Sequence, residues 1–499
     1  MKKTKKFLSV LLVLVMSISL CLPAFAADNE KCPVIYINGI VGNDVYGVIG
    51  DESTIVGYPT TDTLINIVKD IIVPVLVKFP AERDTEALGH DIAEALNEEF
   101  KYWFNNPDGT AKENSGIIAE YPETVNKGSK LKFDYDWRGD PMVIAGELND
   151  YINYVTEKSG SDKVCITAHS LGNVVLLSYL SLYGDDKIKG AVLDSPAIDG
   201  VTFVGQMLCG EIDFDGEALT YAVKGMLGED GYAELLSSIV DIFDLAGIPE
   251  MLSVFLDSII DELGPIIYKE TLVPIFGTWL TIWAMTPDDL IDKATAYVFD
   301  DLMKDEDYSV LEGKIEAYNS SVRKNKKDTL LSFDENAKLA VISRYGYKTP
   351  PLTEAWSMIS DGVIETQNSS LGATTTIIGE VFDDAYLENK DMKYISPDRT
   401  VDASTCLFPE KTWFIKNSEH AQTYVTKRLY DSFLFAEEEL TCDTADMGRF
   451  SYYDDVNDVI TEDNSQPEET KKLSAFERLF NFLKALLKKI MEFFGVKAF

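Results

Sequence analysis

The amino-acid sequence predicts an α/β fold class: a mostly parallel sheet flanked by helices, with an inserted helical cap and a C-terminal amphipathic helix. Apolar, β-branched runs alternate with helical patterns as far as Asp194, and this alternation is typical of parallel sheets. The stretch 197–335 then has a helical pattern throughout, before a strand resumes near Lys338. The final segment, 471–499, differs from the rest because it is basic and amphipathic.

The N-terminus has the features of a secretory signal. An apolar run over 7–22 is followed by Ala24-Phe25-Ala26, and it is preceded by Lys2, Lys3, Lys5 and Lys6. This pattern predicts a signal peptide at 1–26 and a secreted, extracellular protein. Loss of those four lysines takes the formal charge of the 499-residue chain from −38 to −42, so we expect no nucleic-acid partner.

Five cysteines remain after the signal, an odd and sparse set for a secreted chain of this length. We therefore expect no disulfide framework, although one pair can form. Cys165 lies in a predicted strand and is expected to serve as a small buried apolar side chain.

The first half of the chain supplies the expected strands and crossover helices. Pro74 and Pro80 divide a helical pattern that extends from Thr54 to Phe104. The other expected elements are strands at 33–37, 131–138, 164–167 and 189–194, and a helix at 141–155.

A tight turn joins the strand 164–167 to a helical pattern that begins directly behind it. The turn reads Ala168-His169-Ser170-Leu171-Gly172. The residues two before and two after Ser170 are small, which lets strand and helix approach while the serine sits strained at the tip. This nucleophile elbow lies inside a βαβ unit and predicts Ser170 as a nucleophile.

A serine nucleophile needs an imidazole as a general base, and the chain has three histidines. His90 precedes the elbow, and the strand-turn geometry is expected to direct His169 away from Ser170. His420 follows the short strand 411–416, so we predict His420 as the base.

The acid that orients the base has several candidates among 83 acidic residues. Asp398 lies in a loop before His420 and is the preferred choice, with Asp402 and Asp194 as alternatives. Backbone N–H groups of Ile40 and Leu171 are the expected oxyanion-hole donors. No metal-ligand spacing and no phosphate-binding glycine loop is present, so no metal and no cofactor is expected.

The predicted organisation has six parts. They are the signal peptide 1–26, a first core part 27–196, a helical cap 197–335, a second core part 336–453, an acidic linker 454–470 and the basic helix 471–499. The last segment has seven basic residues against two acidic ones and predicts contact with a membrane or envelope surface.

Several segments resemble the lecithin:cholesterol acyltransferase family and related lipases of the α/β-hydrolase superfamily. They are 33–42 (PVIYINGIVG), 133–138 (FDYDWR), 168–173 (AHSLGN) and 397–401 (PDRTV), followed by His420. The resemblance implies a serine acyl-transfer enzyme acting on lipid esters, with Ser170, Asp398 and His420 as the triad. Asn38 and Asp402 depart from the family pattern.

We therefore expect a secreted, lipase- or phospholipase-like serine hydrolase that cleaves carboxylic esters, lipid esters above all, through an acyl-enzyme. One alternative is an O-acyltransferase that passes the acyl group to an alcohol. Another is a non-catalytic protein that binds lipid or envelope on the same fold.

Overall fold

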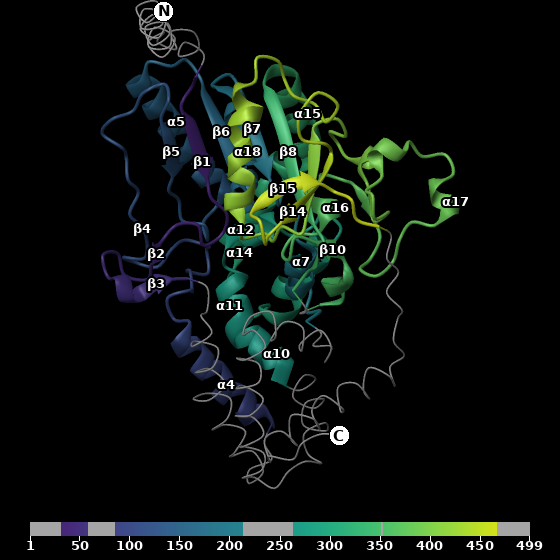
Figure 1. Ribbon diagram of the computed structural model, residues 1–499. Coiled ribbons are helices and arrows are strands. Elements are labelled where there is room, and N and C mark those ends of the chain that lie inside the picture. The colour runs from purple at the N-terminus through teal and green to yellow at the C-terminus, as the bar shows by residue number, and fades with distance from the viewer. Residues whose placement is uncertain (1–30, 58–84, 213–262, 351–352, 467–499) are drawn as a thin grey trace, which may run out of the picture.

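The computed structural model describes residues 31–57, 85–212, 263–350 and 353–466 (Figure 1). The predicted signal peptide, the basic segment 471–499 and the helix expected between 58 and 84 lie outside the described residues.

One large sheet forms the centre of the molecule. Its strands run in the order β15-β14-β13-β8-β7-β6-β1-β5, and adjacent strands are parallel except for the pair β14 and β15. The bounds are β1 Val34–Ile37, β5 Lys130–Phe133, β6 Val164–His169, β7 Ile188–Asp194, β8 Lys338–Tyr345, β13 Thr412–Lys416, β14 Phe450–Asp454 and β15 Val459–Glu462. This mostly parallel sheet confirms the predicted fold class, and its arrangement is that of the α/β-hydrolase fold.

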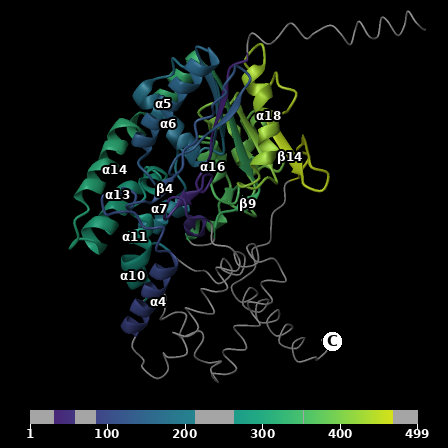
Figure 2. The ribbon, with the colours of Figure 1, turned by 90° about the vertical axis from the view of Figure 1, so that its left-hand side faces the viewer.

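Helices cover both faces of the sheet, which explains why every residue of β6 is buried. Helices α5 (Pro141–Ser159), α6 (Leu171–Tyr183) and α15 (Lys326–Asn336) lie on one face, and α18 (Thr423–Phe435) lies on the other (Figure 2). Side chains of β6 alternate between these layers: Ile166 packs in the α5 and α6 core, while Cys165 packs in the α18 core.

Helix α5 shows how local sequence sets an element's ends. The Asp140 side chain accepts a hydrogen bond from the N–H of Met142, Pro141 occupies the first turn, and Gly160 ends the helix in the left-handed conformation.

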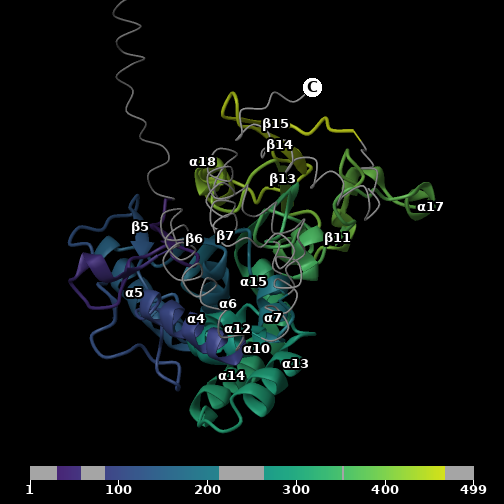
Figure 3. The same ribbon diagram turned by 90° about the horizontal axis from the view of Figure 1, so that it is seen from below.

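Between β7 and β8 the described elements are all helical. They are α7 (Thr202–Leu208), α10 (Gly264–Ile267), η4 (Tyr268–Leu272), α11 (Val273–Phe276), α12 (Leu280–Ala284), α13 (Ile291–Thr295), η5 (Ala296–Leu302), α14 (Ser309–Ser321), η6 (Arg323–Asn325) and α15. Most of them lie beyond the edge of the sheet at which the parallel strands end (Figure 1). Helix α4 (Thr85–Glu99) crosses α10 there, and Leu88 and Ile92 pack against Leu263 (Figure 3).

Tryptophans join these helices to the sheet. Trp103 and Trp137 both pack against Trp279, with ring centroids 5.8 and 5.2 Å away. Thr281 of α12 donates a 2.7 Å hydrogen bond to the carbonyl of Trp137. The insertion is therefore anchored to the segment that follows β5.

Short elements fill the remaining connections. Near the start of the chain they are β2 (Val45–Tyr46), η1 (Glu52–Thr54), β3 (Ile55–Val56) and β4 (Gly116–Ile117). Between β8 and β13 they are β9 (Tyr347–Lys348), η7 (Glu354–Ser357), β10 (Ile359–Ser360), α16 (Thr366–Ser369), β11 (Thr374–Thr375), α17 (Asp384–Leu387), η8 (Met392–Tyr394), β12 (Val401–Asp402) and η9 (Ala403–Thr405).

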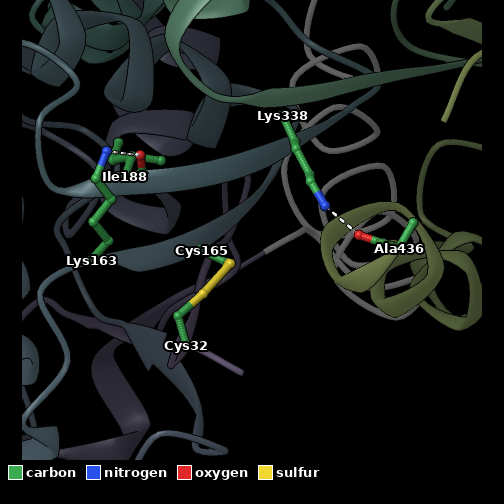
Figure 4. Close-up of a disulfide and its surroundings, with 6 residues drawn as sticks. All are labelled: Cys32, Lys163, Cys165, Ile188, Lys338 and Ala436. Atoms are coloured by element: carbon green, nitrogen blue, oxygen red, sulfur yellow. Dashed lines mark hydrogen bonds between the residues drawn. A yellow bond between two sulfur atoms is a disulfide. The ribbon is translucent and has the colours of Figure 1, made fainter. Parts of the chain in front are cut away.

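Three local expectations need correction. Residues 459–462 of the expected acidic linker form β15, because Tyr453 and Ile460 pair across an antiparallel ladder. The start of the expected helix at Thr54 is instead a 3₁₀ turn followed by β3. Cys165 is buried as expected, but it forms a disulfide with Cys32 (Figure 4).

No helix within the described ranges has the length and apolar character needed to cross a bilayer.

Candidate active site

Ser170 occupies the turn between β6 and α6 in a strained backbone conformation. Its φ is 55° and its ψ is −124°, a region that non-glycine residues rarely adopt and that is concentrated at functional sites. The turn is tight enough that a Cβ on Gly172 would lie 2.4 Å from the carbonyl oxygen of Ile37. Ser170 stands at the N-cap position of α6, yet its side chain makes no capping hydrogen bond. The elbow predicted from sequence is therefore present.

The loop after β1 runs directly against this serine. A Cβ on Gly39 would lie 2.8 Å from Ser170 Cβ and 3.3 Å from Ser170 Oγ, so only glycine fits there. This contact brings Ile40, the next residue, to the elbow that carries Leu171. Both predicted oxyanion-hole donors therefore lie on segments adjoining Ser170.

Aromatic residues after β5 fix the shape of that loop. Tyr135 donates a 2.5 Å hydrogen bond to the carbonyl of Asn38, and Trp137 Nε1 donates to the carbonyl of Asn43 at 3.0 Å. Asn38 itself donates to the carbonyl of Gly42 at 2.9 Å. Asn38 thus closes the loop on itself.

His420 follows β13 and pairs with a carboxylate that the sequence did not single out. Its Nδ1 lies 2.7 Å from Asp361 Oδ2, and its backbone N–H donates to the Asp361 carbonyl at 2.7 Å. Because a carboxylate only accepts hydrogen bonds, Nδ1 carries the proton and Nε2 is left as an acceptor. The His420 ring lies 4.6 Å, centroid to centroid, from that of His169, the neighbour of Ser170.

Asp361 is fully buried directly after β10, in the connection that follows β8. Burial raises the pKa of its carboxyl, but the charge and hydrogen bond of His420, the N–H of Ile364 and the charge of Arg344 outweigh burial and hold the pKa below its ordinary value. Its Oδ1 accepts hydrogen bonds from the N–H groups of Val363 and Ile364, at 3.0 and 2.8 Å. Asp361 is thus kept ionised and fixed beside His420.

The three acids proposed from sequence have other partners. Asp398 accepts a hydrogen bond from Lys416 at 2.7 Å and others from Ser396 and Thr400. Asp402 binds Lys390 and Tyr386. Asp194 binds Arg344, Thr426 and Tyr430. The expectation that Asp398 orients His420 is therefore corrected to Asp361.

His169, the residue before Ser170, packs on the α18 side of the sheet. Alternation along β6 places His169 on the same face as Cys165, where α18 and the loop carrying His420 lie. Burial, together with the charges of His420 and Arg344, holds the pKa of His169 well below its ordinary value. His169 is therefore a neutral ring packed beside His420.

Glu365 is a second buried carboxyl close to Asp361. Its Oε2 accepts hydrogen bonds from the N–H of Thr202 and from Asn368, at 3.1 and 3.2 Å, whereas Oε1 has no hydrogen-bond partner. Burial raises the pKa of Glu365 to about 7. It joins the loop that carries Asp361 to the first turn of α7.

These groups lie at one edge of the sheet because its parallel strands end there. Gly39, Ser170, Asp361 and His420 follow β1, β6, β8 and β13 respectively, and ligand sites of open α/β sheets form at that carboxyl edge. A serine in a strained turn, a histidine paired with a buried carboxylate and nearby backbone N–H groups are the kinds of group from which acyl-transfer sites are built. Among the described residues, no group of histidine, cysteine and acidic side chains could hold a metal ion.

Comparison with known proteins adds little to this geometry. No family model and no curated protein matches the chain. One solved structure that this chain matches is a chain of the Tle4-Tli4 complex, at 15% identity and a TM-score of 0.21. The match covers 36% of this chain and 48% of that one, so this chain spans under half the length of that protein. An esterase, RhEst1 from Rhodococcus sp. ECU1013, matches at 10% identity and a TM-score of 0.24, over 83% of this chain and 93% of that chain.

Proposed function

We propose that the chain is a serine hydrolase of carboxylic esters, with Ser170 as the nucleophile, His420 as the base and Asp361 as the orienting acid. The observation that carries the proposal is the 2.7 Å contact between His420 Nδ1 and Asp361 Oδ2 at the sheet edge where Ser170 stands strained. If His420 were only a hydrogen-bonded residue of the core, the strained backbone of Ser170, φ 55°, in a tight turn at the same sheet edge would have no explanation.

In the proposed mechanism, His420 Nε2 takes the hydroxyl proton of Ser170 as Oγ attacks the ester carbonyl. The N–H groups of Leu171 and Ile40 bind the developing oxyanion. The imidazolium, stabilised by Asp361, then protonates the leaving alkoxide, and an acyl-enzyme remains. Water activated by the same His420 releases the acid.

The finer part of the proposal is that the ester belongs to a lipid and that the enzyme is lipase-like. The resemblance to the lecithin:cholesterol acyltransferase family and the apolar helices between β7 and β8, at the same edge as Ser170, support it. If an alcohol reaches the acyl-enzyme in place of water, the same residues perform O-acyl transfer.

The test is hydrolysis of p-nitrophenyl butyrate and p-nitrophenyl palmitate by the mature protein and by two variants. Ser170→Ala and His420→Ala should each lower kcat by ~10³-fold or more, because each removes a member of a unit that acts together. Ser181→Ala on α6 and His90→Ala on α4 are matched controls that should retain the parent rate. Preference for palmitate would support a lipid substrate.

Equal rates in the parent and in Ser170→Ala would contradict the proposed serine hydrolase activity and favour a lipid- or envelope-binding protein. New esters formed when glycerol or cholesterol is added would identify acyl transfer.

A further inference from the structure

Arg344 is an arginine without exposed surface on β8, outside the triad proposed above. Its Nη1 donates hydrogen bonds to the carbonyls of Glu419 and His420, at 2.8 and 2.7 Å. Its Nη2 donates to Asp194 Oδ2 at 2.6 Å and to Thr426 Oγ1 at 2.9 Å. One guanidinium therefore holds the backbone of the residue that carries the imidazole.

Asp194, the acid paired with Arg344, also accepts a hydrogen bond from the backbone of Ser170, the proposed nucleophile. Its carbonyl accepts hydrogen bonds from the N–H of Ser170 at 3.0 Å and from the side chain of Asn173 at 3.2 Å. Its carboxylate accepts from Tyr430 at 2.5 Å and from Thr426 at 2.6 Å. A continuous path thus leads from the Ser170 backbone through Asp194 and Arg344 to the His420 backbone.

Arg344 also contacts the segment that carries the acid. Its carbonyl accepts a hydrogen bond from Thr366 Oγ1 at 3.2 Å, and Thr366 begins the helix five residues after Asp361. Burial lowers the pKa of the guanidinium, but Asp194, Tyr430 and Asp361 outweigh burial and raise the pKa, so Arg344 stays charged. All three segments of the site therefore contact Arg344, two through its guanidinium and one through its backbone carbonyl.

A fully buried ion pair is poor evidence of a contribution to stability. Removing two charges from water costs several kcal/mol, and well-packed apolar residues often replace such pairs without loss. What the pair provides is geometry, because the planar guanidinium fixes two carbonyls and one carboxylate at once. Lysine offers a single point charge and cannot reproduce that fork.

We propose that Arg344, through its ion pair with Asp194, is a positioning residue that sets the His420 ring relative to Ser170. The proposal rests on the proposed hydrolase function. The proposal predicts an effect on the chemical step and none on substrate binding. Arg344 is fully buried, and its hydrogen bond with His420 is to the backbone carbonyl and not to the imidazole.

The test compares Arg344→Lys with Arg449→Lys, using p-nitrophenyl butyrate. Arg449 is a buried arginine that also donates to a backbone carbonyl, that of Pro409, and pairs with an acid, Glu410, away from the site. Arg344→Lys should lower kcat per folded molecule by roughly 10²-fold with KM within about twofold, because a displacement of about 1 Å costs that much. Arg449→Lys should retain the parent kcat.

A milder variant keeps the proposal testable if Arg344→Lys does not fold. Thr426→Val removes the hydrogen bonds of Thr426 with Arg344 and with Asp194 but leaves no charge unpaired. We expect kcat to fall about fivefold, less than in Arg344→Lys, because the ion pair itself remains. An unchanged kcat in whichever of the two variants folds, or a rise in KM with no change in kcat, would overturn the positioning role of Arg344. A parent chain that cleaves no ester would overturn the proposed function, and this assignment with it.

Discussion

Asp361 and Asp398 are both buried carboxyls between β8 and His420, but only Asp361 lies against the imidazole. Replacing Asp361 with Asn should lower kcat by ~10³–10⁴-fold at neutral pH, because an amide stabilises neither the required tautomer nor the imidazolium. The measurement is steady-state hydrolysis of p-nitrophenyl butyrate.

Asp398→Asn is the matched control. Its carboxylate binds Lys416 and not the imidazole, so the variant should keep kcat per folded molecule within a few-fold of the parent. A greater loss in Asp398→Asn than in Asp361→Asn would show that the sequence-based choice of acid was right.

Glu365 gives a prediction about pH and stability. Its pKa is raised to about 7 in the folded protein, from 4.5, so the folded state binds the proton more tightly than the unfolded state. The stability this provides is complete below pH 4.5 and is lost as the pH rises through 7. The loss is about 3 kcal/mol at most, from 1.36 kcal/mol per pKa unit.

Glu365→Gln keeps the acceptor for Thr202 and Asn368 but does not ionise. Urea denaturation at pH 5 and pH 8 should show that the parent loses stability relative to this variant as the pH rises. The comparison cancels the opposite effect of His169, whose lowered pKa makes it destabilising as the pH falls below 6.5. Parallel pH profiles for the two proteins would contradict the prediction.

Ser170 was predictable because its motif is local in the sequence, and His420 because histidines are few in this chain. The elbow is a short strand-turn-helix pattern, and the chain has three histidines. Asp361 was not predictable, because 83 acidic residues compete and its contact with His420 spans 59 positions. The available signal was the Ile359-Ser360-Asp361-Gly362 segment, an apolar residue followed by an Asp-Gly turn soon after a resumed strand.

At the scale of elements, the disulfide between Cys32 and Cys165 joins the segment just before β1 to β6, across a sequence separation of 133. Closing so long a loop restricts the unfolded chain, which is worth about 3–5 kcal/mol. The double variant Cys32→Ala, Cys165→Ala should lose that much stability in urea denaturation under oxidising conditions and no longer respond to a thiol reductant. The control Cys209→Ala removes a free cysteine, keeps the disulfide and should stay as sensitive to the reductant as the parent. Equal stability of the parent with and without a thiol reductant would contradict this.

Elements with strong local patterns were predicted correctly, including residues 164–167 of the buried strand β6 and the crossover helix α5, although β6 extends two residues further, to His169. Elements stabilised by distant contacts were not. The acidic, polar segment 454–466 has the composition of a linker, yet β15 forms there because β14 offers an unpaired edge. Cysteine spacing likewise does not reveal which two strands become neighbours.

The whole molecule combines a strongly acidic body with a basic C-terminal segment. Without the predicted signal peptide 1–26 the formal charge is −42, and removing 471–499 as well would take it to −47. We propose that this segment binds an anionic surface that would otherwise repel the body, since its lysines and apolar residues alternate at helical spacing. The mature chain should therefore sediment with vesicles of phosphatidylglycerol and phosphatidylcholine, and the deletion variant should not.

Charge reversal separates this attraction from apolar insertion. Reversing Lys484, Lys488 and Lys489 to Glu should weaken vesicle binding by at least ~10²-fold, at about 1 kcal/mol for each basic residue near an anionic surface. Reversing Lys127, Lys304 and Lys324, three exposed lysines of the body, changes the net charge equally and should have a much smaller effect. Binding of the parent should also weaken in 0.5 M salt, where screening shortens the range of the attraction. If the two triple variants lost binding equally, net charge would control the interaction and the C-terminal segment would have no specific part in it.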